Sequence, residues 1–328
     1  MSVFPGGAWC PVRVYRADGQ WLVDWIHLGD QRFTEPFFDG AIRHCLRLPF
    51  NLAVRPQTPL ADLPESDPEA VPPAGFIFHL SRCGSTLVAQ TFAANPETIA
   101  LSEPGPVDDV IRAARFEPGV GDRWREERLR AIVSALGRRR HPGERRLVIK
   151  LDAWHVFDLP LVERAFPGVP WFFIYRDPYE VMVSHRRAFS WFMSAVNCSL
   201  LGLTIVEAMQ VPEHEYRARM LGRICEAVLA HGVGPERLIA YEELPAALES
   251  RIAPAFGLPF GEAERAALER DAKMPQRRFV PDGASKRADV DDALREATDR
   301  FVLEPYLRLE AIRTGAQDKR SAPPVTPG

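Results

Sequence analysis

Cysteine is scarce in this sequence of 328 residues, and the few cysteines follow no pattern. They stand at positions 10, 45, 83, 198 and 225. None forms a C-x-x-C pair, so the sequence indicates neither a structural zinc site nor a disulfide framework. A reducing, cytoplasmic compartment is therefore the expected location.

Long apolar runs and an excess of positive charge are missing as well. No uninterrupted apolar stretch has the length of a membrane-spanning helix, and the first residues, MSVFPGGAWCPV, lack the basic start and apolar core of a signal peptide. The 41 Lys and Arg residues are balanced by 44 Asp and Glu residues, which argues against nucleic acid as a partner. The arginine-rich stretch 123–146 also contains Glu126 and Glu127, as is typical of a solvated charged face. Neither membrane nor nucleic acid is expected to bind.

The first 74 residues divide into two segments. In residues 1–54 the runs VRVYR and WLVDWIHL are joined by a turn sequence containing Asp18 and Gly19, which predicts a β-hairpin. A short helix is expected to follow over 37–46. Residues 55–74 are rich in proline and lack apolar periodicity, so they are predicted to be a linker or a loop that follows the surface.

From Gly75 onward the sequence alternates between two kinds of apolar pattern. Four short apolar runs have the composition of strands buried on both faces: GFIFHL, RLVIKLD, PWFFIYR and RLIAYEEL. Helical patterns lie between and after them, over 86–95, 107–115, 123–140, 159–165, 178–192, 216–231, 262–273 and 290–312. This alternation predicts an α/β domain over 75–313, a three-layer, doubly wound parallel sheet with helices on both faces. The tail, 314–328, is expected to be disordered.

A phosphate-binding loop is indicated where the first of these strands ends. The run GFIFHL leads directly into Ser81-Arg82-Cys83-Gly84-Ser85-Thr86 and then into an apolar helical pattern. A strand, a turn of small residues and a helix N-terminus gather backbone N–H groups around one point and attract phosphate. An ordinary strand-to-helix turn is the alternative. Ser85 stands where nucleotide triphosphatases have the lysine of G-x-x-x-x-G-K-[ST], which disfavours an ATPase or GTPase.

The same residues resemble the 5′-phosphosulfate loop of sulfotransferases. In those enzymes a basic residue precedes a small residue and then Gly-Ser or Gly-Thr; here Arg82 is the basic residue, and Cys83 stands where many members have serine. The resemblance implies a fold like that of the P-loop nucleoside triphosphate hydrolases and the co-substrate 3′-phosphoadenosine-5′-phosphosulfate. It assigns Arg82, Cys83, Gly84, Ser85 and Thr86 to co-substrate binding, with Arg82 also stabilising the charge of the reaction.

A second motif follows the strand PWFFIYR. Asp177, Pro178 and Glu180 have the spacing of a helix cap after Arg176, which places Arg176 at the carboxyl end of a strand. The string Y-R-D-P-x-E-V-M-V-S resembles the 3′-phosphate motif of sulfotransferases, and so implies that Arg176 and Ser184 bind the 3′-phosphate. A salt bridge from Arg176 to Asp177 or Glu180 is the structural alternative.

Two later features resemble the same family. The run LIAYEEL with the following FGLP is similar to a structural element in which Glu242 is expected to pair with a buried polar partner. Ser285-Lys286-Arg287 occupies the place of a late basic loop that closes over the nucleotide, so Lys286 and Arg287 are candidates for co-substrate contacts. A solvated surface loop is the alternative for these two residues.

The general base is the least determined part of the predicted site. Glu103 resembles an acidic residue after the phosphate loop of several sulfotransferases. Asp152 ends the run RLVIKLD, where cytosolic members have a histidine after Lys-Thr, and His155 lies three residues later with a suitable ordinary pKa. Lys150 is a candidate for reaching the sulfuryl group. The sequence shows no cluster of metal ligands, and the reaction needs no metal.

Two other functions stay open at this point. A kinase using Mg²⁺ and ATP is one, because RLVIKLD ends in an acidic residue; a nucleotide-binding protein without catalysis is the other. For a sulfotransferase the expected partner is a small-molecule or glycan acceptor with a hydroxyl or amine. Residues 1–54 are expected either to cover the acceptor site or to mediate oligomerisation, as a homodimer for example.

Overall fold

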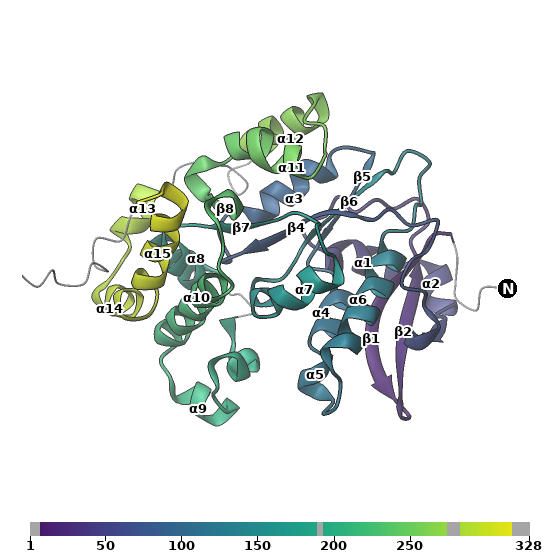
Figure 1. Cartoon of the computed structure of the whole chain (residues 1–328), viewed down its shortest axis with the longest axis horizontal. Helices are drawn as coiled ribbons and strands as arrows, with labels where there is room; N and C mark the ends of the chain where they lie inside the picture. The colour runs from purple at the N-terminus through teal and green to yellow at the C-terminus, as the bar shows by residue number, and fades with distance from the viewer. Residues whose placement is uncertain (1–6, 189–192, 274–282, 317–328) are drawn as a thin grey trace, which may run out of the picture. The chain divides into compact units, whose positions relative to one another are not determined.

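The computed structural model describes residues 7–188, 193–273 and 283–316 and folds as two compact units (Figure 1). Unit 1 comprises Met1–His79, Gly84–Phe172 and Glu243–Val280. Unit 2 comprises Leu80–Cys83, Phe173–Glu242 and Pro281–Gly328. Within the described residues, no helix is long and apolar enough to cross a membrane.

A five-stranded sheet has the strand order β5-β6-β4-β7-β8. The strands are β4 (Pro73–His79), β5 (Thr98–Ser102), β6 (Arg146–Lys150), β7 (Trp171–Tyr175) and β8 (Leu238–Ala240). β5 and β4 both pair with β6 in parallel, and β7 pairs with β8 in parallel. The first strand, β4, is central and later strands extend the sheet on both sides, which is the order of a doubly wound sheet. The predicted α/β fold is confirmed.

The N-terminal region forms a separate antiparallel sheet, drawn in purple in Figure 1. β1 (Trp9–Ala17) pairs with β2 (Gln20–His27) around a turn in which Asp18 and Gly19 have φ of 48° and 82°. These positive φ values suit a tight hairpin turn with glycine at its second position. The hairpin and the helix α1 (Phe38–Leu46) are therefore confirmed.

The proline-rich segment differs from the predicted linker. β3 (Gln57–Pro59) adds a third strand to the N-terminal sheet by pairing with β2. The indole Nε1 of Trp25 donates a hydrogen bond of 2.9 Å to Thr58 Oγ1, and the side chains of Leu60 and Val71 are buried. Proline is tolerated here because β3 is an edge strand.

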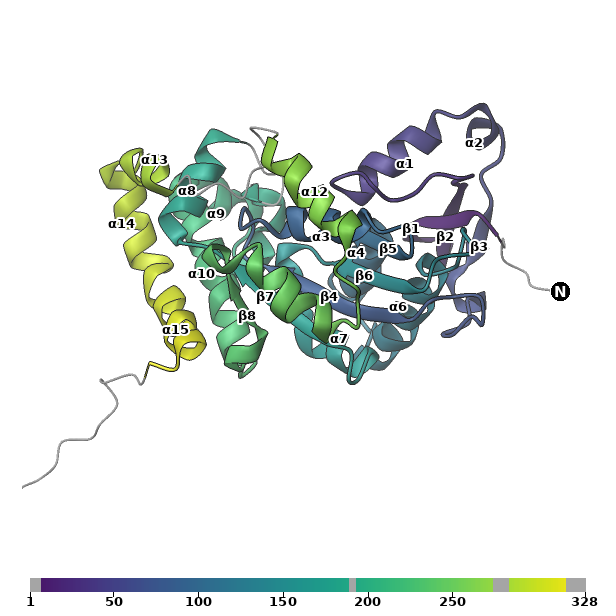
Figure 2. The ribbon, with the colours of Figure 1, turned by 90° about the horizontal axis from the view of Figure 1, so that it is seen from above.

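Helices of unit 1 cover its strands and one another (Figure 2). Those described are α1, α2 (Pro49–Ala53), α3 (Ser85–Ala93), α4 (Gly105–Ile111), α5 (Ala113–Phe116), α6 (Asp122–Leu136), α7 (Leu159–Ala165), α11 (Ala253–Ala255) and α12 (Glu262–Lys273). α3 packs on β5 and β6, and α12 packs on α3. Gly75 in β4 leaves room for Phe256, the residue after α11, because a Cβ at Gly75 would lie 2.1 Å from the Phe256 ring.

Helices of unit 2 are α8 (Pro178–Arg187), α9 (Ile205–Gln210), α10 (Glu213–Ala230), α13 (Gly283–Ala288), α14 (Asp292–Phe301) and α15 (Leu303–Thr314). α10 packs against α14 and α15 (Figure 1, Figure 2). Gly222 permits this contact, since a Cβ there would lie 2.0 Å from the Phe301 carbonyl oxygen.

Several boundaries differ from those predicted. The helix expected over 107–115 is broken at Arg112 into α4 and α5, and that expected over 290–312 is broken at Val302 into α14 and α15. The strand β5 was not among the predicted runs. Most of the tail predicted to be disordered, 314–328, and the last residues of the helix predicted over 178–192 lie outside the described residues.

Candidate functional site

The predicted phosphate loop joins β4 to α3. Ser81, Arg82 and Gly84 have φ of 75°, 52° and 84°, and Gly84 is the residue that precedes the first turn of α3. Two consecutive non-glycine residues with positive φ are uncommon, and such backbone conformations concentrate at ligand-binding sites. The N–H groups of Ser85 and Thr86, the first two residues of α3, have no partners within the helix.

In unit 2 the loop residue Arg82 contacts the second predicted motif. Its Nε donates a hydrogen bond of 2.9 Å to Ser184 Oγ on α8. Cys83 is buried, and its Sγ lies 3.0 Å from the carbonyl oxygen of Ile174 in β7. The Cys83 side chain thus anchors the loop to β7 and does not point to a ligand.

Arg176 is held by α8. It is 4% exposed, and its Nε and Nη2 donate to Glu180 Oε2 over 2.7 and 2.6 Å. Its guanidinium lies 3.9 Å from the centre of the Tyr241 ring, a cation–π contact. Asp177 caps α8 as predicted by accepting from the N–H groups of Tyr179 and Glu180. The Arg176–Glu180 pair is therefore real, but it is buried rather than on the surface.

The late basic segment is a helix, α13, instead of the predicted loop. Arg287 pairs with Asp177 at 2.6 Å and lies 3.6 Å from Glu180, although its side chain is 62% exposed. Lys286 is buried. Gly283 lets α13 approach α8, because a Cβ there would lie 2.2 Å from Glu180 Oε1. Arg176, Ser184, Lys286 and Arg287 thus all belong to unit 2.

Glu242 does not have the role predicted for it. Its side chain is exposed, whereas the neighbouring Glu243 pairs with Arg251 at 3.0 Å. Partial desolvation of the carboxyl by its neighbours nonetheless raises the pKa of Glu242, and the charge of Glu180 adds to the shift. The two consecutive glutamates in the sequence gave no means of deciding which would be paired.

In unit 1 the carboxyl ends of β5 and β6 bring Glu103 and Lys150 together. Lys150 is 1% exposed and forms an ion pair with Glu103, which itself has a φ of 56°. His79 at the end of β4 places Nε2 3.5 Å from Glu103 Oε1 and 3.0 Å from the Leu151 carbonyl oxygen. Burial alone would raise the pKa of Glu103, but Lys150 and His79 lower that pKa to about 2.

Asp152 follows β6 in a different environment. Its side chain is buried, and burial, together with the charges of Glu103 and Asp108, raises the pKa of Asp152 well above the usual range even though Lys150 opposes the shift. A carboxyl group of this kind accepts a proton more readily than Glu103 does.

His155 lies in the turn Ala153–Asp158 and is fully buried. Its Nδ1 accepts a hydrogen bond of 3.2 Å from the Asp152 N–H, and its Nε2 lies 2.9 Å from Asp108 Oδ1. Trp154 Nε1 donates to the same Asp108 oxygen over 2.6 Å. Both ring nitrogens of His155 are therefore engaged in fixing the turn that carries Asp152.

Asp108, Asp152 and His155 also form a group that the sequence did not reveal. One potential ligand atom from each lies within 4.8 Å of the others, so the expectation that no ligand cluster exists is wrong. A metal ion bound here would compete with Asp108 and with the Asp152 N–H for the two nitrogens of His155.

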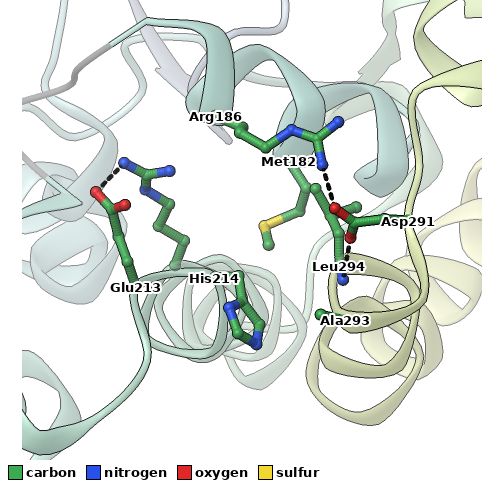
Figure 3. Close-up of a pocket in the computed structure, with 8 residues that line it drawn as sticks. Met182, Arg186, Glu213, His214, Asp291, Ala293 and Leu294 are labelled. Atoms are coloured by element: carbon green, nitrogen blue, oxygen red, sulfur yellow. Dashed lines mark hydrogen bonds and ion pairs between the residues drawn. The ribbon is translucent and has the colours of Figure 1, made fainter.

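A cavity of about 170 Å³ lies elsewhere in unit 2 (Figure 3). Figure 3 shows the Arg186–Asp291 pair on one side and Glu213 on the other. Glu213 is paired with Arg217. None of the predicted site residues lines this cavity. Its charges are paired with one another, which leaves the loop after β4 as the better candidate for an anion.

Comparison with known proteins gives structural neighbours but no match in sequence. No protein-family model and no curated protein matches the chain. Similar solved structures include the sulfotransferase from Alicyclobacillus acidocaldarius, with 16% identity and a TM-score of 0.44 over 74% of this chain and 96% of that one. The sulfotransferase domain from the curacin biosynthetic pathway has 16% identity and a TM-score of 0.40 over 76% and 99%. A sulfotransferase from Mycobacterium avium has 15% identity and a TM-score of 0.40 over 74% and 78%. Similarity of this size does not establish a function, which must come from the residues of the site.

Proposed function

We propose that the protein is a sulfotransferase that uses 3′-phosphoadenosine-5′-phosphosulfate. The hydrogen bond between Arg82 and Ser184 carries the proposal. It joins the basic residue of the phosphate loop to the serine of the second motif inside one unit, as expected if both groups bind phosphates of one nucleotide. Arg176 and Arg287 belong to the same unit, where each is in an ion pair with an acidic residue.

In the proposed reaction an acceptor hydroxyl or amine attacks the sulfur in line with the departing bisphosphate. A bond from the acceptor to sulfur forms as the bond from sulfur to the phosphate oxygen breaks. Arg82 and the N–H groups of the loop would stabilise the negative charge that develops on that oxygen. Arginine keeps its proton at ordinary pH, so Arg82 would act by charge and hydrogen bonding.

Asp152 is the proposed proton acceptor. Glu103 is paired with Lys150 and its pKa of about 2 makes it a weak base. His155 has no free nitrogen. The raised pKa of Asp152 makes its carboxylate a stronger base than that of Glu103, and the acceptor's proton would go to it. His155 then acts as a positioning residue, and the acceptor remains a small molecule or glycan of undefined structure.

Calorimetric titration with adenosine 3′,5′-bisphosphate tests the co-substrate. We expect binding that does not need Mg²⁺ and that weakens about tenfold or more in Ser184→Ala, since a hydrogen bond to a charged phosphate is lost. Ser184→Ala is preferable to a change at Arg176, because removing Arg176 would take the closer of two cationic partners from the buried Glu180. Ser250→Ala, on an exposed residue, is the matched control.

Two results would contradict the proposal. The first is no binding of the bisphosphate to the wild-type protein. The second is preferred binding of ATP with Mg²⁺, which would indicate a kinase. Equal binding by the wild type and Ser184→Ala would remove Ser184 from the site and leave the co-substrate assignment standing.

A further inference from the structure

The short helix α2 in unit 1 has its polar residue inside and its apolar residues outside. Asn51 is the only buried residue of this helix. Its Nδ2 donates to the carbonyl oxygens of His27 and Cys45 over 2.7 and 3.0 Å, and its Oδ1 accepts from the His27 N–H over 2.8 Å. Phe50 and Leu52, on either side of it, are 51% and 62% exposed. A helix that only completes the core of its own unit has the opposite arrangement.

The exposed apolar surface continues on both sides of α2. Leu48 before the helix and Val54 after it are exposed as well. We call Leu48, Phe50, Leu52 and Val54 the α2 patch. At its edge the ring of Trp9 lies 5.8 Å from the Phe50 ring, measured between centroids. Exposed apolar residues that occur singly need no explanation, whereas a group of this kind indicates a surface that binds another one.

Three arginines accompany the α2 patch in the sequence. Arg43, Arg47 and Arg55 are exposed, and none of them is in an ion pair within the part of the chain that the structure describes. Arg43 and Arg55 each donate Nε to a backbone carbonyl oxygen one turn earlier, those of Asp39 and Asn51. Positions 40–61 contain no Asp or Glu. The three guanidinium charges are therefore free to attract an anion from outside the chain.

A second exposed apolar surface, on α9 in unit 2, lacks this charge. Val206 and Met209 are 63% and 77% exposed, so they are as accessible as the α2 patch. Positions 193–216 contain neither Lys nor Arg, and the charged residue of α9 is Glu207, which forms a capping box with Thr204. The combination of apolar surface with unpaired arginines thus distinguishes α2 from α9.

This combination fits an anionic lipid surface. Such a surface offers an apolar interior to phenylalanine and leucine and offers phosphate groups to arginine. Arginine suits the boundary between the two because its stem packs on apolar surface while its guanidinium reaches the headgroups. Four of the five residues of α2 are exposed. The helix therefore stands out from unit 1, as entry into a lipid layer requires.

We propose that α2 and its neighbouring arginines form a docking face for an anionic lipid surface. Phe50 and Leu52 enter the apolar boundary of the lipid layer, and Arg43, Arg47 and Arg55 bind the phosphates of its headgroups. The charge balance of the whole chain, from which no membrane partner was expected, averages over this local excess of positive charge. The inference is independent of the proposed sulfotransferase function.

Sedimentation of the full chain with vesicles tests the inference. One set of vesicles contains phosphatidylcholine alone, and the other contains phosphatidylcholine with the anionic lipid phosphatidylglycerol. We expect the protein to sediment with the anionic vesicles only. High salt should release it, because screening weakens the attraction between the arginines and the headgroups. Sedimentation of the protein without vesicles gives the background.

Two double variants separate the apolar and the charged contribution. Phe50→Ser/Leu52→Ser should lower the partition coefficient for anionic vesicles about tenfold or more, because the apolar side chains that enter the lipid are lost. Arg43→Gln/Arg47→Gln should lower it by a similar factor of about ten, because two attractive charges are lost. All four side chains are exposed, so both variants should keep the thermal unfolding midpoint of the wild type.

Val206→Ser/Met209→Ser is the matched control, since it removes equally exposed apolar side chains from α9, and it should bind the anionic vesicles like the wild type. The inference is wrong if the wild type does not sediment with anionic vesicles, a result that needs no variant to fold. Equal binding to both kinds of vesicle, or an equal loss in the α9 control, would also contradict it. If the wild type ignores vesicles but self-associates, and Phe50→Ser/Leu52→Ser is monomeric, the α2 patch binds a second copy of the chain instead.

Discussion

Arg82 and Ser184 are 102 positions apart in the sequence and are joined by a hydrogen bond of 2.9 Å from Nε to Oγ. The loop after β4 and the helix α8 therefore share one polar contact in unit 2. A guanidinium that is held at Nε still has its two terminal nitrogens, the pair of donors that bind phosphate in a fork. The contact thus positions Arg82 without consuming its capacity for an anion.

Arg82→Gln should weaken binding of adenosine 3′,5′-bisphosphate about tenfold to a hundredfold, because a charged hydrogen-bond donor is lost. The affinity of Arg82→Lys for the bisphosphate should lie between that of Arg82→Gln and that of the wild type, since lysine keeps the charge but not the forked pair of donors. Calorimetric titration measures both. Arg123→Gln, which changes a 92% exposed arginine, should bind like the wild type. Equal affinity of all four proteins would remove Arg82 from the site.

Neutralising one partner of the buried Lys150–Glu103 ion pair should lower the free energy of unfolding. Glu103→Gln leaves Lys150 charged and almost fully buried, and we expect a loss of about 3–5 kcal/mol in the free energy of unfolding. The double variant Glu103→Gln/Lys150→Met removes both charges and should recover part of that loss. Urea unfolding provides the comparison, with Glu65→Gln, from the exposed pair with Arg130, as a control of small effect. A single variant as stable as the wild type would contradict a structural role for the pair.

Asp152→Asn should lower turnover by roughly a factor of 10² to 10⁴, the usual contribution of a general base, and leave the affinity for the bisphosphate unchanged. Sulfate transfer from 3′-phosphoadenosine-5′-phosphosulfate to a panel of alcohols and amines is the assay. Because the pKa of Asp152 is raised, wild-type activity should rise with pH above the range in which an ordinary aspartate titrates. Full activity of Asp152→Asn would exclude it as the base.

Asp109 makes the stability of unit 1 depend on pH. It accepts a hydrogen bond of 2.7 Å from the Val14 N–H of β1, and burial, with a smaller contribution from Asp108, raises the pKa of Asp109 from its ordinary 3.8 to about 7. Between these two pH values the folded state holds a proton that the unfolded state has lost. Stability from this group therefore falls as the pH rises from about 4 to about 7, and is constant above that.

Asp109→Asn imitates the protonated form and should remove this dependence. Relative to the variant, the wild type should lose up to about 1.4 kcal/mol of stability for each pH unit in the window. Thermal unfolding of both proteins at several values between pH 5 and 8 measures the difference. Parallel curves would show that Asp109 titrates normally in the folded protein.

Much of the fold could be predicted because its signals are local. The Asp18-Gly19 turn between two apolar runs specifies the hairpin, and Asp177 with Pro178 specifies the start of α8. The break at Arg112 carries no such signal, since neither proline nor glycine marks it. The break at Val302 is marked by Pro305, which has no N–H to continue the hydrogen bonds of the preceding helix, and the prediction overlooked it. β5 was missed because it is a short run, TIALS, whose buried character depends on its pairing with β6.

Candidate site residues could be named where a single motif contained them. Arg82, Arg176 and Ser184 were selected in this way. The pairing of Lys150 with Glu103 requires knowing that β5 and β6 are neighbours, which the order of strands along the chain does not reveal.

All five thiols are free and buried, and they are spread over both units, from Cys10 in β1 to Cys225 in α10. Desolvation raises the pKa of Cys10 to about 12, so its reactive thiolate is almost absent in the folded state. A thiol reagent should consequently label each position only when the surrounding structure opens. Mass spectrometry of the labelled peptides would then time the opening of each part of the molecule separately, and Cys83 would report on the loop after β4 without any engineered probe.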